Sequence, residues 1–141
     1  MKQKHFGLLL PFLFAFSLTA QSQPTWANDV APILYKHCVT CHRVGGVGSF
    51  PLQTWTDAKL KAPDVLDAVQ SRYMPPWRAN PSYRHFKDEN YLSSTDIQTI
   101  ADWVDGGLKP GDLSQAPPLP NFQNGSQLST VDIALESPQC H

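Results

Sequence analysis

Two cysteines and a histidine stand in the first half of the chain with the spacing C-x-x-C-H, at Cys38, Cys41 and His42. Thiols one helical turn apart can add across the two vinyl groups of one porphyrin. The histidine that follows is then held under the ring, where it can reach the iron. This spacing is the signature of c-type haem attachment. The sequence therefore predicts one covalent haem, linked at Cys38 and Cys41, with His42 as an axial ligand.

Two other kinds of site use the same pair of cysteines. A C-x-x-C pair can be half of a zinc site, but such a site needs two more Cys or His ligands, and the chain has no second C-x-x-C pair. The pair can also be a redox dithiol of the thioredoxin kind, which should follow a strand in a βαβ pattern. No such pattern is visible, so haem attachment is favoured over both alternatives.

The segment R-Y-M-P-P-W at residues 72–77 offers the ligand for the other face of the iron. Pro75 biases Met74 toward an extended backbone, so the thioether sits on a stiff, non-helical segment. Apart from Met1, it is the only methionine in the chain. Ligation by His42 and Met74 would raise the reduction potential and fill both axial positions. A centre of this kind transfers single electrons and performs no bond chemistry, so the chain is expected not to be an enzyme.

Other residues compete for this role. Met74 can be an ordinary core residue, in which case the sixth position has a different ligand or none. His85 could bind instead and give a bis-histidine centre of lower potential, although a solvated loop histidine is the simpler interpretation. His37 is expected in the last turn of a helix, where it interacts with the carbonyl dipole and does not reach the opposite face of the haem.

The N-terminus has the pattern of an export signal. Lys2 and Lys4 precede an apolar run over residues 6–18, which is short for a membrane span and is broken by Pro11. Small residues follow, so we expect a signal peptide over residues 1–22 that is cleaved to leave no transmembrane helix. An uncleaved anchor is the alternative. Export to the periplasm agrees with the motif, because c-type haem is attached on the outer side of the bacterial membrane.

Three helical segments are expected to position these residues. Asn28 can cap the first helix, with Asp29 in its first turn, and Thr56 or Asp57 can cap the second, which Pro63 interrupts. The third has an S-x-x-D capping box and ends at a Gly-Gly pair. It is expected to pack across the first. The three segments cover residues 28–38, 56–71 and 92–105.

The connections between these helices should form the rest of the haem pocket. The glycine-rich loop over residues 43–51 is expected to pass the haem edge, with Phe50 and Leu52 covering the ring. Aromatic side chains from several segments are candidate pocket walls, with ordinary core packing as the plain alternative. They are Phe50, Trp55, Tyr73, Trp77 and Trp103.

Together, C-V-T-C-H, the segment at 72–77 and the helix end W-V-D-G-G resemble a monohaem cytochrome c domain over roughly residues 26–120. More narrowly, the chain resembles bacterial domains with N-D-V-A-P-I-L before the haem motif and M-P-P-W after it. The resemblance implies an all-α fold, a small cytochrome c-like helical domain with long loops around one haem c. It also implies thioether links at Cys38 and Cys41, His42 as proximal ligand and Met74 as distal ligand.

Domains of this narrower type often precede a copper, ascorbate-dependent monooxygenase-like domain. A type-2 copper site needs several histidines, and only His85 and His141 follow the motif. We therefore expect a signal peptide (1–22), a cytochrome c domain (23–113) and a Pro-rich linker and tail (114–141). Cys140, in the tail, is expected to be a free thiol.

The expected function is that of an exported one-electron carrier with redox protein partners as donor and acceptor. One alternative is the electron-entry module of a truncated or partnered copper monooxygenase-like enzyme. Another is a haem sensor with a labile sixth ligand. The chain is slightly acidic, with 11 Lys and Arg against 12 Asp and Glu, and has no basic patch. Nucleic acid is therefore not an expected partner.

Overall fold

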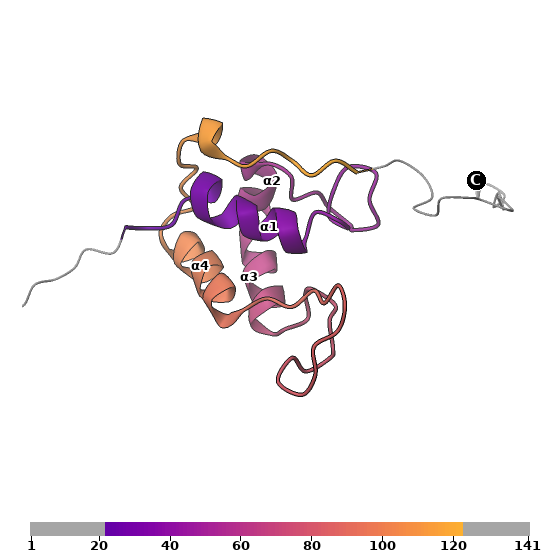
Figure 1. The fold of residues 1–141 in the computed structure, drawn as a ribbon. Helices are drawn as coiled ribbons and strands as arrows, with labels where there is room; N and C mark the ends of the chain where they lie inside the picture. The colour runs from indigo at the N-terminus through magenta and orange to yellow at the C-terminus, as the bar shows by residue number, and fades with distance from the viewer. Residues whose placement is uncertain (1–21, 123–141) are drawn as a thin grey trace, which may run out of the picture.

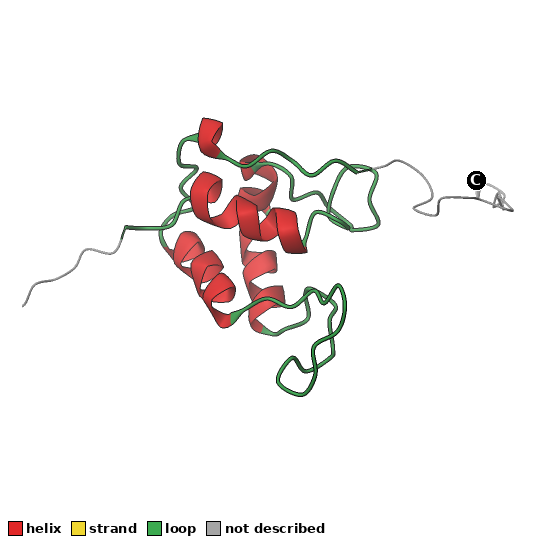
Figure 2. Cartoon of the chain, viewed as in Figure 1, coloured by secondary structure: helices red, strands yellow, loops and turns green. Residues whose placement is uncertain are grey.

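The computed structural model describes residues 22–122, and within this range the protein is helical, without any strand (Figures 1 and 2). The expected all-α class is thereby confirmed for the described part of the chain. Short helices alternate with long loops, so the loops form much of the surface. The elements are η1 (Trp26–Val30), α1 (Ala31–His37), α2 (Trp55–Leu60), α3 (Ala62–Gln70), α4 (Ser94–Asp105) and η2 (Leu113–Gln115).

The first helix begins earlier than the sequence pattern suggests. A π-helical turn, η1, leads directly into α1, and the carboxylate of Asp29 accepts hydrogen bonds from the backbone and hydroxyl of Thr25. The expectation that Asn28 caps the helix is therefore wrong. The N–H groups of Trp26 and Ala27 donate to carbonyl oxygens at residues 109 and 110, at 2.9 and 3.0 Å. A distant segment thus satisfies the start of this helix, and no local cap is needed.

The second helical segment is divided where a proline was expected to divide it. α2 ends at Leu60, and α3 starts at Ala62 with Pro63 in its first turn, where a missing N–H costs nothing. The N-cap of α2 is Thr54, and neither Thr56 nor Asp57 takes that role. Asp57 completes a capping box, because its carboxylate accepts from the N–H of Thr54 while its own N–H donates to the Thr54 hydroxyl.

The last long helix, α4, ends at Asp105 as predicted and begins at Ser94, two residues after the predicted start. Ser93 and Asp96 form the expected capping box at its start, and Gly107 adopts a positive φ of 87° just beyond its end. The helix packs against α3 and against η1 at the start of the first helix (Figure 1). The expected crossing of the first and last helices therefore occurs at the π-helical turn.

Buried side chains from these helices form one continuous core with a smaller cluster beside it. The main cluster surrounds η1 and α1 and includes Trp103 from α4, while the smaller one lies between α3 and α4. The indole N–H of Trp103 donates to the carbonyl of Lys109, and that of Trp55 donates to the carbonyl of Leu108, both at 2.9 Å. These two tryptophans therefore attach the segment after α4 to the core.

The chain after α4 returns along the domain toward the loop that follows the C-x-x-C-H motif (Figure 1). Ala116 and Phe122 pack against the main cluster, and the guanidinium of Arg43 lies 4.4 Å from the centroid of the Phe122 ring. The first residues of the predicted tail thus belong to the packed domain. The remainder, residues 123–141 with Cys140, lies outside the described residues.

The predicted signal peptide lies almost wholly outside the described residues, so its assignment stays a prediction. Over residues 22–122, no helix has both the length and the apolar character needed to span a bilayer.

Candidate functional site

The four residues that the sequence singles out line one cavity. It has a volume of about 990 Å³, and its wall includes Cys38, Cys41, His42 and Met74. The first three come from the end of α1, whereas Met74 comes from the loop after α3. Residues 32 or more positions apart therefore meet around a space at the upper end of the usual size range for ligand sites.

Backbone hydrogen bonds at the end of α1 fix the spacing of the motif. The N–H of Cys38 still donates to Leu34 at 2.8 Å, and the N–H groups of Cys41 and His42 both donate to the carbonyl of Cys38, at 3.1 and 2.9 Å. The chain thus makes one more tight turn beyond the helix. This turn brings the two thiols and the imidazole to the same cavity, as the chemistry of the motif requires.

A hydrogen bond to the backbone sets the orientation of the His42 ring. Its Nδ1 lies 3.0 Å from the carbonyl oxygen of Phe50, and because a carbonyl only accepts, Nδ1 carries the proton and donates it. The lone pair is then on Nε2, the atom that a neutral histidine offers to a metal. The Phe50 ring packs on the imidazole, with 4.8 Å between the ring centroids.

The pair Cys38 and Cys41 lacks one property of a redox-active dithiol. They form no disulfide, and burial, together with the neighbouring Cys41, raises the pKa of Cys38 to about 12. Redox-active C-x-x-C cysteines have the opposite property, a lowered thiol pKa. Over residues 22–122 there is also no cluster of three or more His, Cys, Asp or Glu side chains that could bind a metal ion. The described residues therefore favour neither the dithiol nor the zinc alternative.

Met74 is held at the end of α3 by its backbone. Its N–H donates to the carbonyl of Ala68 at 3.0 Å, and the half-buried side chain borders the cavity. The loop that carries it is closed at its base, because Arg72 donates to the carbonyl of Leu92 and its guanidinium lies 4.7 Å from the centroid of the Tyr91 ring. Met74 is thus close to a fixed point at the start of an otherwise long loop.

A second cavity, of about 910 Å³, adjoins the first and shares Met74 as part of its wall. Trp77 lines it and packs edge-on against Phe86, with 6.3 Å between the ring centroids. Within the described part of the chain, the buried Nε1–H of Trp77 has no hydrogen-bond acceptor. The buried indole N–H of Trp26 is unpaired as well, but of the two only Trp77 lines one of these cavities. Because an unpaired buried N–H is costly, the Trp77 indole is suited to a ligand that brings an acceptor into that cavity.

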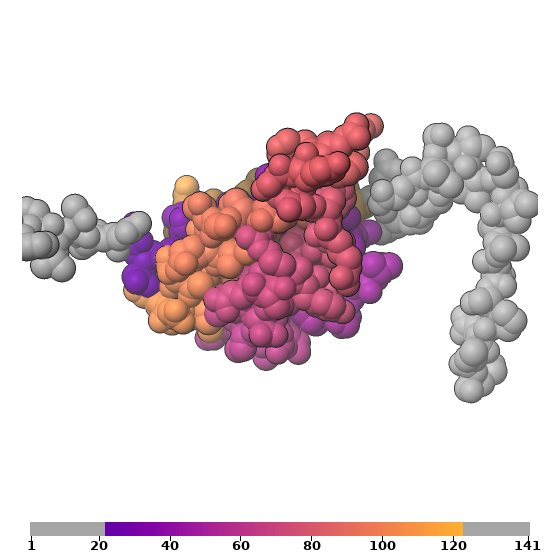
Figure 3. Space-filling model, turned by 90° about the horizontal axis from the view of Figure 1, so that it is seen from below, coloured from indigo at the N-terminus to yellow at the C-terminus, as the bar shows by residue number. Residues whose placement is uncertain are grey.

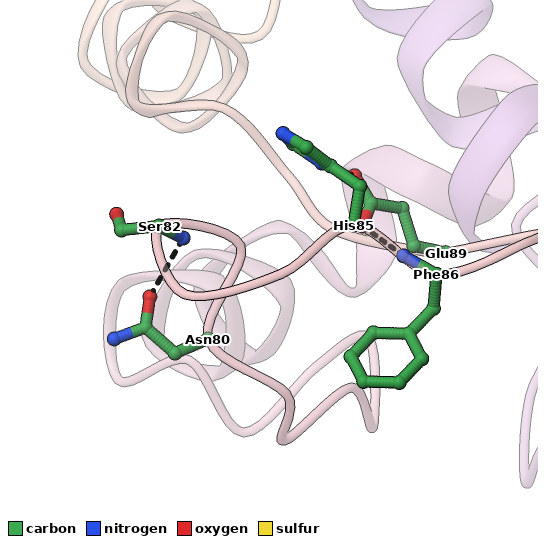
Figure 4. Close-up of polar contacts among 5 residues, drawn as sticks. All are labelled: Asn80, Ser82, His85, Phe86 and Glu89. Atoms are coloured by element: carbon green, nitrogen blue, oxygen red, sulfur yellow. Dashed lines mark hydrogen bonds and ion pairs between the residues drawn. The ribbon is translucent and has the colours of Figure 1, made fainter.

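His85 lies away from both cavities. Its side chain is 80% exposed, and its Nδ1 pairs with the Glu89 carboxylate at 2.9 Å (Figure 4). This hydrogen bond, reinforced by one from the backbone N–H of Phe86, lowers the pKa of Glu89. The loop that carries the pair, residues 78–91, projects from the body of the domain (Figure 3). The structure therefore does not bring His85 into position as a sixth ligand.

The predicted pocket walls divide into two groups. Phe50, Leu52 and Tyr73 line the first cavity, as expected. Trp55 and Trp103 line neither cavity, so the expectation that they form pocket walls was wrong. Their indole N–H groups instead donate to carbonyl groups in the segment after α4.

Asn90 is a cavity residue that the sequence did not indicate. It lines both cavities and bonds to His37 twice: its Oδ1 lies 2.6 Å from His37 Nδ1, and its Nδ2 donates to the His37 carbonyl at 3.0 Å. His37 is buried and also borders the first cavity. An asparagine in a polar loop carries no periodic signal, and its partner lies 53 positions away.

Comparison with known proteins gives no match to a family model, to a curated protein or to a solved structure. The assignment of a function to this site therefore depends on its residues and geometry.

Proposed function

We propose that the protein is an exported electron carrier that holds one haem c between His42 and Met74. The observation that carries this proposal is the shared cavity of about 990 Å³, which Cys38, Cys41, His42 and Met74 all line. Chain segments from either side of α2 and α3 must meet for these residues to share a wall. Ordinary core packing does not require two thiols, an imidazole and a thioether to surround one space.

The residues around the two adjoining cavities fit a covalent haem in three respects. Cys38 and Cys41 would form the thioether links. His42, with Nδ1–H donated to Phe50, has a free Nε2 to bind iron. The buried Nε1–H of Trp77 lacks a protein acceptor among the described residues, and a carboxylate of the haem is the kind of group that would provide one.

When bound, haem would supply the Fe(III)/Fe(II) couple, and the chain would supply the surroundings that tune it. A thioether on the second axial position favours the reduced iron. Phe50 and Leu52 contribute apolar wall and limit the access of water on the His42 side. With both axial positions filled, no position remains for a substrate, so the site suits electron transfer between protein partners and not catalysis.

Export completes this proposal. The predicted signal peptide would carry the chain to the periplasm, where c-type haem is attached. The leader lies almost wholly outside the described residues, and the described residues do not identify the redox partners.

A haem sensor is the second candidate, and one observation favours it. Met74 has cavity on both sides, because it borders the adjoining space of about 910 Å³ as well. A thioether with room to move away from the iron could leave the sixth position to a small gas molecule. The carrier and the sensor differ in how readily the Met74 thioether would leave the iron.

One set of measurements tests both candidates. The full chain is produced in a periplasm that contains the haem-attachment machinery, and its mass and spectra are recorded. The carrier proposal expects one covalent haem and the weak red absorption band of a ferric haem with a thioether ligand. The band should disappear in Met74→Ala and persist in His85→Ala, the matched control.

Carbon monoxide separates carrier from sensor. Slow binding to the reduced wild-type protein and fast binding to Met74→Ala support a closed electron-transfer site. Equally fast binding to both would favour the sensor, and a chain isolated without covalent haem would contradict both candidates.

A further inference from the structure

We propose that Asn90 and His37 form a clamp that keeps the Met74 loop closed over the haem cavity, and that this clamp sets how often the sixth ligand leaves the iron. The proposal rests on the proposed function, because it assigns a positioning role around the same iron. His37 is the residue directly before Cys38, and Asn90 lies in the loop three residues before Ser93, the N-cap of α4.

The two side chains are bonded through complementary groups. The amide of Asn90 has a donor nitrogen and an acceptor oxygen, and both bond to the same residue: Nδ2 donates to the His37 carbonyl at 3.0 Å, and Oδ1 accepts from His37 Nδ1–H at 2.6 Å. The carbonyl belongs to the last residue of α1, which has no helical partner for it. Asn90 thus caps the end of α1 as well as holding the imidazole.

The position of the clamp connects the two sides of the cavity. α1 leads directly into the turn that supplies Cys38, Cys41 and His42, whereas the loop after α3 supplies Met74. Asn90 borders both cavities together with Met74, so it lies on the same wall as the distal ligand. The clamp is therefore a direct bond between the element that carries one axial ligand and the loop that carries the other.

Other contacts hold the base of the loop, because Arg72 donates to the Leu92 carbonyl and its guanidinium lies 4.7 Å from the centroid of the Tyr91 ring. They join the two ends of the loop to each other, and neither involves α1. Residues 82–88 are all exposed. The side-chain bonds at the tip, from Asn80 to the N–H of Ser82 and from His85 to Glu89, connect the loop only to itself (Figure 4). They can stiffen the tip, but they cannot hold it against α1.

Met74 itself is held from one side. Its N–H bonds to Ala68 on α3, but its thioether has space toward the second cavity. If the far end of the loop separates from α1, the wall behind Met74 opens and the thioether leaves the iron more often. Two hydrogen bonds of ordinary net strength correspond to about a thirtyfold change in the population of the open loop.

The test uses the haem-loaded chain and measures carbon monoxide binding to the reduced iron. Asn90→Ala removes both bonds and should bind carbon monoxide about thirtyfold faster than the wild type, whereas His37→Phe removes only the bond to Oδ1 and should bind it about fivefold faster. The double variant should be little faster than Asn90→Ala. Ser82→Ala and His85→Ala alter the same loop without touching the clamp, and they should bind at the wild-type rate. Ser93→Ala, which weakens α4, controls for a general loss of stability and should also leave the rate unchanged.

A measurement on the wild type does not depend on any variant. In the haem-loaded protein the Nδ1–H proton of His37 should give a resolved nuclear magnetic resonance signal that exchanges slowly with solvent, because Asn90 accepts it inside the cavity wall. Rapid exchange of that proton would show that the clamp does not form, whatever the variants do.

The outcomes for this inference and for the proposed function are distinct. If the wild type has covalent haem and its red band but Asn90→Ala binds carbon monoxide no faster than Ser82→Ala, the clamp is overturned and the electron-carrier proposal stands. If the wild type has no covalent haem, both proposals fall.

Discussion

The Nδ1 atom of His42 lies 3.0 Å from the carbonyl oxygen of Phe50, and this contact leaves no space for a side chain at residue 48. A Cβ at Gly48 would lie 2.7 Å from the same Nδ1 and 2.9 Å from the carbonyl oxygen of Cys41. The glycine-rich loop after the motif therefore approaches the imidazole with its backbone. The loop that the sequence predicts to pass the haem edge thus also supports the imidazole of His42.

Gly48→Ala should displace the His42 ring, with a stability cost of about 1–3 kcal/mol from overpacking and a lower yield of haem-loaded protein. Gly45→Ala is the matched control. A Cβ there meets nothing within 4 Å, but the φ of 74° is strained for alanine, so stability should fall by about 1 kcal/mol with normal haem spectra. Thermal unfolding and the haem spectrum together test this pair. Equal spectra in the two variants would contradict a specific contact at residue 48.

The Cys38 thiol should be unreactive in the haem-free chain. Because its pKa is raised to about 12, mainly by burial, almost none of it is thiolate at neutral pH. Alkylation followed by peptide mass analysis should therefore modify the exposed Cys41 first, and the rate at Cys38 should continue to rise with pH toward 12. Equal rates at pH 8 would show that Cys38 is not buried as described.

The same shift predicts how stability depends on pH. In the unfolded chain the thiol ionises near its ordinary value of 9.0, whereas in the folded chain it stays protonated up to about 12. Between these values the unfolded state binds fewer protons, so the haem-free protein should lose stability as pH rises through this window. In the proposed haem-loaded form, Cys38 would be a thioether with no proton to lose. Denaturant unfolding of the two forms at several pH values should show the loss in the haem-free form only.

The cap of α4 should make a measurable contribution to stability. Ser93→Ala removes the hydroxyl that accepts the N–H of Asp96 at 3.0 Å, and loss of such a cap costs about 1 kcal/mol. Ser94→Ala is the control, since this neighbouring serine is exposed and is not the cap. Thermal unfolding should separate the two variants, and an equal effect would mean that the capping box contributes little in the folded protein.

Local signals in the sequence were sufficient where the structure is local. Ser93 and Asp96 bond to each other's backbone within one turn, and Pro63 begins a helix because its ring cannot continue one. Cys38, Cys41 and His42 are close in sequence, so their spacing alone indicates that they meet.

Long-range hydrogen bonds explain what the sequence did not show. Nothing near Asn28 reveals that carbonyl groups some 80 residues away complete the start of the first helix. In the same way, Trp55 and Trp103 are aromatic residues of the kind that line haem pockets, but their indole N–H groups donate to the segment after α4. Asn90 belongs to no sequence motif or periodic pattern that would indicate its role. These positions are fixed by tertiary contacts, which periodicity and capping rules do not contain.

The indole N–H of Trp77 gives a prediction about the haem carboxylates. This N–H is buried, borders the second cavity and has no acceptor among the described residues. If it donates to a carboxylate of the haem, it stabilises the ionised form and lowers the pKa of that carboxyl group. Trp77→Phe keeps a ring to pack against Phe86 but removes the donor, so the carboxyl pKa should rise.

This change can be read from the midpoint potential as a function of pH. A protonated carboxyl group is less negative and favours reduced iron, so the potential falls as the group ionises. In Trp77→Phe that fall should move to higher pH. Trp55→Phe is the matched control: it removes an indole N–H that donates to the Leu108 carbonyl, away from both cavities, and should cost about 1 kcal/mol of stability with an unchanged profile. If the two variants have the same potential profile as the wild type, the Trp77 N–H does not bind the haem carboxylate.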